Sequence, residues 1–216
     1  MNSLFNPESS TMRFLEKAAN LMLLNLLWIL CSLPIITIGA SSTALYTMVF
    51  KLLNSENESI NIIKPFFSVF RKEFWKSEGI YGITLVLALI VTANAFVSQR
   101  LPTPLSICAL VPFFIFCIAL GYIFPLYSKF ENNYVNTLKN AVLLSLIHFP
   151  KSILILCSNL LPVIVLLLSE ALFWKLFVFW ILIYFALSAY FVAKWLTPIF
   201  DKMILSTKAD ENANSI

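Results

Sequence analysis

Charge is scarce in this chain of 216 residues. Only 12% of the residues are charged and 60% are hydrophobic, whereas about 25% of the residues in a soluble domain are charged. This scarcity argues against nucleic-acid binding, because so apolar a chain has no soluble face for contacts with phosphates. We expect an all-α, polytopic membrane protein, a helical bundle that crosses the lipid bilayer several times.

The chain also has few groups that could support catalysis or metal binding. It has one histidine, and no zinc-protease, phosphate-binding-loop or serine-hydrolase motif. Its four cysteines lie inside apolar segments, where packing is expected rather than a disulfide or a metal site. We therefore expect no enzymatic activity, no metal and no cofactor. His148 and Lys151 stand where a span should begin, so anchoring at the membrane interface is favoured over contact with a substrate or lipid headgroup.

Long apolar segments are what the chain has in abundance. A helix needs about 20 apolar residues to cross the hydrocarbon core. A single domain, residues 1–205, is expected, with spans at about 12–33, 40–54, 77–99, 105–128, 150–169 and 173–195. The polar tail 206–216 is expected to be disordered.

A break in the first apolar run decides the topology. Residues 18–50 would form a helix of about 50 Å, which is too long for one straight crossing. Pro34 removes a backbone donor and Gly39 is conformationally permissive, so the run either kinks, giving five spans, or turns back as a hairpin, giving six. The hairpin leaves only Arg100 and Lys175 outside, and it is favoured because Lys and Arg concentrate on the cytoplasmic side.

The broken helix is also the place where a ligand could meet backbone groups at membrane depth. The candidate ligand-facing residues are Pro34, Thr37, Gly39, Ser41 and Asn25. Their polar side chains could instead form hydrogen bonds between packed helices. At the break itself both interpretations stay open.

Two shorter helices are expected at the cytoplasmic surface of the membrane, at about residues 60–76 and 133–148. In the first, aromatic residues recur at helical spacing with basic residues on other faces, which is typical of a helix that lies in the interface. Its candidate contacts with lipid or with a partner are Phe66, Phe67, Phe70, Phe74, Arg71 and Lys72.

The N-terminal sequence resembles a known family. Residues 4–52, LFNPESSTMRFLEKAANLMLLNLLWILCSLPIITIGASSTALYTMVFKL, are similar to the opening of the YesL-like proteins, bacterial multipass membrane proteins with a domain of unknown function. The aromatic segment 66–74 and the sequence HFPK at 148–151 also fit this family. The resemblance implies location in the bacterial cytoplasmic membrane, and the charge distribution predicts that both termini are cytoplasmic.

Genes for YesL-like proteins often lie beside genes for carbohydrate-uptake ABC transporters and their sensor histidine kinases. The resemblance thus implies a non-catalytic accessory or scaffold subunit that contacts subunits of such a transporter or the kinase, with a homo-oligomer as a further option. The alternative is a small transporter or channel that uses the broken helix at Pro34 to Ser42. A polar path through the membrane would favour the alternative.

Overall fold

The computed structural model describes residues 10–54, 61–100, 102–130 and 132–214, and the regular structure in these ranges is helical. The helices are α1 Ser10–Ser32, η1 Ile35–Thr37, α2 Ile38–Asn54, α3 Ile63–Lys72, α4 Phe74–Ser98, α5 Thr103–Lys129, α6 Tyr134–Ile147, α7 Phe149–Leu168, α8 Glu170–Lys175, α9 Phe177–Phe179, η2 Trp180–Tyr184 and α10 Phe185–Asn214. Six segments are long and apolar enough to cross a membrane: Thr11–Ser32, Ile35–Asn54, Phe74–Ser98, Leu105–Lys129, Phe149–Leu168 and Phe177–Ser206. The prediction of an all-α membrane protein with six spans is confirmed.

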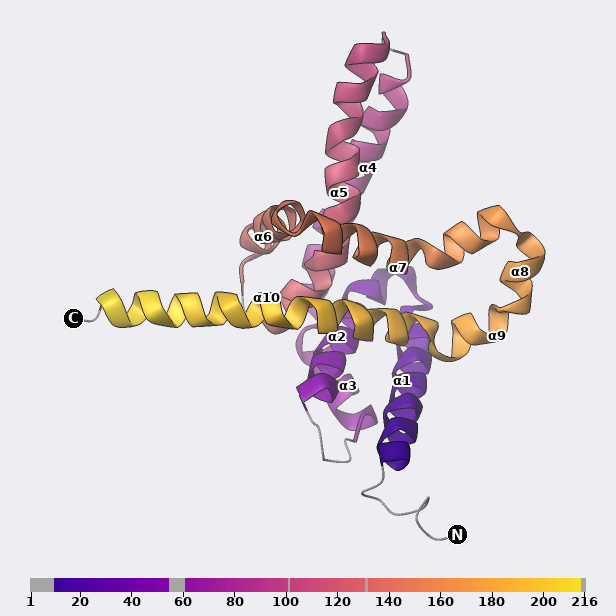
Figure 1. Ribbon diagram of the computed structural model, residues 1–216, viewed down its shortest axis with the longest axis vertical. Helices are drawn as coiled ribbons and strands as arrows, with labels where there is room; N and C mark the ends of the chain where they lie inside the picture. Colours follow the sequence, from indigo (N-terminus) through magenta and orange to yellow (C-terminus); the bar gives the residue numbers. More distant parts are fainter. Residues whose placement is uncertain (1–9, 55–60, 101, 131, 215–216) are drawn as a thin grey trace.

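The long helices pair as three hairpins, α1–α2, α4–α5 and α7–α10 (Figure 1). The α4–α5 hairpin projects along the long axis of the molecule, away from α1, α2 and α3, while α7 and α10 run across that axis. The hydrophobic core lies where the hairpins cross. Its largest fully buried side chains include Leu24 of α1, Tyr122 of α5 and Leu196 of α10.

The break in the first apolar run occurs where the sequence predicts it. Pro34 has an extended backbone (φ −74°, ψ 112°) and precedes the single 3-10 turn η1. Beyond this turn, α2 folds back along α1. The Trp28 Nε1 donates to the Ser42 hydroxyl at 3.2 Å, and the hydroxyl oxygens of Ser32 and Ser41 are 2.6 Å apart. The run is therefore a hairpin, and the five-span alternative is wrong.

The apex of the α1–α2 hairpin contacts the beginning of α4. The backbone amide of Ala40 donates to Glu78 Oε1 at 2.7 Å. Ser98, the last residue of α4, is 20 residues beyond Glu78, which corresponds to about 30 Å of helix. The outer part of the α4–α5 hairpin thus extends well past the apex of α1–α2, as Figure 1 shows.

The two short helices expected near residues 60–76 and 133–148 are present as α3 and α6. One expectation about α3 is wrong. Phe66 is fully buried in the core, because α3 packs along α2, so its ring contacts neither lipid nor a partner. Helical periodicity identified the apolar face of α3, but an apolar face can turn toward lipid or toward protein.

The C-terminal segment also departs from expectation. The sequence predicts disorder over residues 206–216, whereas α10 continues to Asn214, and residues 215–216 lie outside the described part of the chain. No proline or glycine lies between Pro198 and Asn214, and lysine, alanine and glutamate within this stretch favour helix. The helix that carries the sixth span therefore extends beyond its apolar part.

Candidate functional site

Some backbone groups at the helix break are paired by Thr37. The Thr37 amide donates to the carbonyl of Pro34 at 2.9 Å. The Thr37 hydroxyl lies 2.5 Å from the carbonyl of Cys31 and 2.7 Å from that of Pro34. These contacts occupy carbonyls that a bound cation or a polar substrate would otherwise use. Leu33, Ile35 and Ile36 are more than 70% exposed, so the apex presents an apolar tip.

Glu78 closes the other side of the break. Its carboxylate accepts from the backbone amides of Ala40 and Gly39 at the start of α2. These amides belong to a helix N-terminus, which carries partial positive charge and is a natural anion site. The chain's own carboxylate therefore occupies the position that an anionic ligand would take. Sequence reasoning missed Glu78, because the contact joins residues 38 positions apart and no local pattern indicates it.

Gly39 allows this close approach of α2 to α4. A Cβ atom at position 39 would lie 2.5 Å from the carbonyl oxygen of Ser77 and 2.8 Å from the Cβ of Tyr81. Real Cβ atoms essentially never come so close to backbone atoms, so only glycine fits at this crossing. The glycine at the break is thus explained by helix packing.

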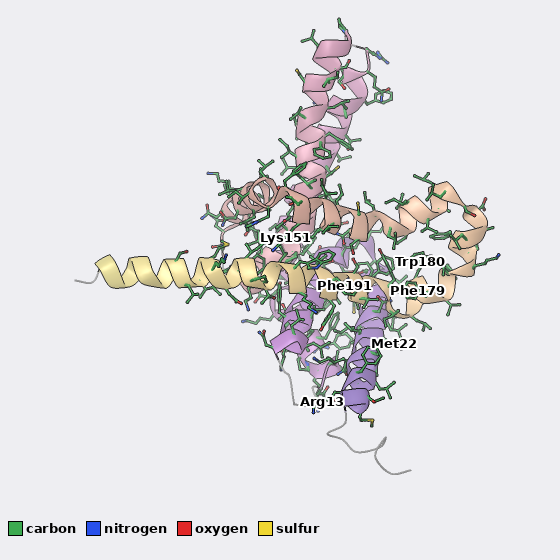
Figure 2. All side chains as sticks on the ribbon, in the orientation of Figure 1. Arg13, Met22, Lys151, Phe179, Trp180 and Phe191 are labelled. Carbon is green, nitrogen blue, oxygen red and sulfur yellow. The ribbon has the colours of Figure 1, made fainter. Side chains whose placement is uncertain are left out.

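Asn25 does not face the break. Its side chain is fully buried and reaches the π-helix η2. The amide nitrogen donates to the carbonyls of Ile181 at 2.5 Å and Trp180 at 3.3 Å, and Oδ1 accepts from the Ala186 amide at 2.8 Å. In Figure 2, the label Met22 marks α1, the helix that carries Asn25, and the label Trp180 marks the start of η2, which leads into α10. Asn25 therefore joins two spans and compensates for the irregular backbone of η2.

A small cavity lies beside these contacts, where α1, α2, α5, α7 and α10 meet. Its volume is about 190 Å³, below the roughly 300–1,000 Å³ of typical ligand sites. The lining consists of Trp28, Ser42, Leu45, Tyr46, Leu120, Gly121, Phe124, Pro125, Asn159, Tyr184, Phe185, Ser188 and Ala189. Among these the Ser188 hydroxyl donates to Asn159 Oδ1 at 3.3 Å. Among the described residues of the lining there is no carboxylate, imidazole, amine or thiol, and the polar groups are the hydroxyls of Ser42, Tyr46, Tyr184 and Ser188, the Asn159 amide and the Trp28 indole.

Part of the predicted aromatic and basic surface of α3 is exposed. Ile63, Lys64, Phe67, Ser68, Arg71 and Lys72 line one shallow hollow on this face. Phe70 and Phe74 stack edge to face, with ring centroids 5.7 Å apart, and both are half-buried. Of the six residues predicted as contacts, Phe67, Arg71 and Lys72 are exposed and remain accessible to lipid or to a partner.

His148 and Lys151 lie together at the junction of α6 and α7, where the sequence places the beginning of a span. They line a hollow of about 400 Å³ with Pro198, Lys202 and other residues of α10. The backbone amide of His148 donates to the Leu144 carbonyl at 2.9 Å, which ends α6. Among the lining residues that the structure describes there is no carboxylate. In the part of the chain that the structure describes, no group of three or more metal-binding side chains occurs.

Comparison with known proteins gives one match. A family model, described as a protein of unknown function, DUF624, matches residues 21–95, which is about a third of the chain. No curated protein and no solved structure matches the sequence. The matched region contains α2, α3 and most of α1 and α4, and hence the break and its contact with Glu78. Residues 21–95 are thus similar to this family of unknown function, which is consistent with the resemblance to the YesL-like family.

Proposed function

We propose that this chain is a non-catalytic accessory or scaffold subunit of the bacterial cytoplasmic membrane. Its partners would be subunits of a carbohydrate ABC uptake system or the membrane sensor histidine kinase of that system, as the family resemblance implies. The observation that carries the proposal is the α4–α5 hairpin, whose outer part projects from the core and is covered only by its own two helices (Figure 1).

The side chains of α4 fit a docking role. Its buried residues are Ser77, Ile80, Thr84 and Ser98, of which three are hydroxyl residues. Mid-helix, Thr92 and Asn94 are exposed although the surrounding segment is strongly apolar. Polar side chains within a span stabilise contacts between helices better than contacts with lipid. The Asn94 amide already donates to the Ala109 carbonyl of α5 at 2.8 Å, and a partner helix against its exposed side would complete its protein environment, whereas Thr92 points to another face of α4.

The other described features favour a scaffold over a transporter. The break at Pro34 to Ser42 is closed by the Glu78 carboxylate, and the cavity between the spans is small and has no charged lining. A transporter would need a polar path or a binding site at this depth. The exposed residues Phe67 and Arg71 on α3 offer a second contact for a partner.

Co-purification from native membranes in a mild detergent tests the proposal. Transporter subunits or the sensor kinase should be recovered with the tagged wild-type chain and quantified by mass spectrometry. Asn94→Phe should lower this recovery about tenfold, the effect of roughly 1.4 kcal/mol, because the larger ring prevents close packing of a partner helix. The substitution is apolar and leaves membrane insertion intact.

Leu89→Phe is the matched control. Leu89 is 71% exposed on a different face of α4, and this variant should keep recovery within about twofold of wild type. Solute flux through proteoliposomes that contain only this protein would contradict the scaffold role and support the transporter. Equal loss of recovery in both variants would show that the face around Asn94 is not the docking surface.

A further inference from the structure

A cationic cleft lies at the base of the α4–α5 hairpin. Its volume is about 660 Å³, which is within the usual range for ligand sites. The lining residues come from α2, α3, α4, α5, the start of α6 and the connections α3–α4 and α5–α6: Thr43, Thr47, Val69, Lys72, Glu73, Lys76, Tyr127, Ser128, Lys129, Phe130, Asn132 and Tyr134. Five helices therefore converge on one polar hollow.

Positive charge exceeds negative charge in this lining. Lys72, Lys76 and Lys129 face one carboxylate, Glu73, and the Lys72 ammonium lies 3.6 Å from Glu73 Oε1. Among the lining residues that the structure describes, Glu73 is the only carboxylate, so no second carboxylate faces the remaining two lysines. The Lys129 ammonium lies over the ring of Phe50, 5.4 Å from its centroid, a contact that holds the charge without neutralising it.

The uncharged groups of the cleft also suit an anion. The hydroxyls of Thr43, Thr47 and Ser128 donate to backbone carbonyls of their own helices, so they are not the donors for a ligand. The other donor groups among the described lining residues are the ammonium groups, the Asn132 amide and the phenols of Tyr127 and Tyr134. The two tyrosine rings lie 6.5 Å apart, centroid to centroid.

Tyr134 can lie at the wall of the cleft because Gly79 has no side chain. A Cβ atom at position 79 would lie 2.7 Å from the Tyr134 hydroxyl oxygen. The phenol therefore rests directly on the backbone of α4, close to the first turn of that helix. The spacing of helices at this corner is adapted to a tyrosine in the cleft wall.

The position of the cleft indicates where its ligand comes from. Two candidate spans meet here, because Phe74–Ser98 begins at the cleft and Leu105–Lys129 ends at it. Trp75, next to Lys76, is 84% exposed, and tryptophan is typical of the membrane–water interface. Lysines at the ends of spans interact with anionic lipid headgroups. The cleft is thus open at the level of the phosphates of one leaflet.

We propose that this cleft binds the phosphate of an anionic phospholipid headgroup. Lys76 and Lys129 supply the charge, and Tyr134 and Asn132 supply neutral donors. The acyl chains would follow the apolar surface of the α4–α5 hairpin, where Val86, Leu89 and Ile90 are exposed. Nothing in the scaffold proposal requires this lipid, so the two proposals can fail independently.

Native mass spectrometry of the full chain in detergent measures the binding. The probes are dioctanoyl phosphatidylglycerol, dioctanoyl phosphatidylcholine and inorganic phosphate. The wild-type chain should bind phosphatidylglycerol at least tenfold more tightly than phosphatidylcholine. The double variant Lys76→Gln/Lys129→Gln should bind phosphatidylglycerol at least tenfold more weakly than wild type, and Tyr134→Phe about threefold more weakly.

Lys64→Gln combined with Lys139→Gln is the matched control, because both lysines are exposed and neither lines the cleft. This control should bind phosphatidylglycerol within twofold of wild type. An equal loss in the control would overturn the proposal, since it would show attraction by net charge alone. Displacement of phosphatidylglycerol by equimolar inorganic phosphate would assign the cleft to a soluble phosphate and overturn the lipid assignment.

Discussion

Replacing Asn25 by leucine should destabilise the fold far more than an ordinary exposed substitution. Leucine has the same branching and number of heavy atoms as asparagine, so the change removes hydrogen bonds without opening a cavity, and its larger methyl groups add crowding to this loss. Three contacts are lost: the bonds to the carbonyls of Trp180 and Ile181 and the bond from the Ala186 amide. Ala186 is fully buried, so its amide is left without a partner.

The size of the effect follows from these three contacts. Hydrogen bonds between membrane helices contribute about 0.6 kcal/mol each on average, and a buried donor without a partner costs about 1–3 kcal/mol. Together these values predict a loss of roughly 2–4 kcal/mol in the free energy of unfolding. For a chain of this size, 1 kcal/mol corresponds to roughly 2–4 °C in Tm, so a decrease of about 5–15 °C is expected.

Thermal unfolding of the purified protein in detergent, followed by tryptophan fluorescence, gives the Tm. Asn94→Leu is the control, because Asn94 makes a single exposed contact, from its amide to the Ala109 carbonyl at 2.8 Å. This control should lower the Tm by no more than about 3 °C. Equal decreases for Asn25→Leu and Asn94→Leu would refute the reasoning.

A compensating deletion tests the cause. A π-helix has one residue more per turn than the α-helical pattern accommodates. Deleting Leu182, which is 40% exposed, should let η2 pair as an α-helix and give the Ala186 amide a backbone partner. The variant that combines Asn25→Leu with this deletion should therefore have a higher Tm than Asn25→Leu alone. The deletion alone should lower the Tm of the wild-type chain, since Asn25 would then be buried without its partners.

Two further predictions concern the hairpin and the topology. Gly39→Ala should lower the Tm by about 5 °C or more, because its methyl group would meet the Ser77 carbonyl. Glu78→Gln should lower the free energy of unfolding by less, about 1 kcal/mol, since the oxygen of the glutamine amide can still accept from the Ala40 amide after the charge is lost. A larger decrease in Tm for Glu78→Gln than for Gly39→Ala would contradict this order. In intact cells of a cysteine-free variant, a cysteine at Gln99 should react with an impermeant maleimide from outside and a cysteine at Ser3 should not, and labelling at Ser3 would overturn the predicted cytoplasmic N-terminus.

Much of the fold follows from local sequence. Length and hydropathy identify the six apolar segments, because a span must be apolar for about 20 residues whatever it packs against. Pro34 identifies the break, since its missing amide disrupts helix in any surroundings. Helical periodicity likewise predicts α3 and α6 close to their observed bounds. In each case one short segment carries the whole signal.

The contacts that define the candidate sites come from tertiary structure alone. Asn25 and Ala186 are 161 residues apart, and Ala40 and Glu78 are 38 residues apart. In a soluble protein the apolar face of a helix marks the side that is buried, but in a membrane protein the lipid-facing and protein-facing sides are both apolar. The sequence by itself therefore determined which segments cross the membrane and where the first one breaks. Only the packed helices decided that Phe66 faces the core, that Glu78 closes the break and that three lysines from different helices line one cleft.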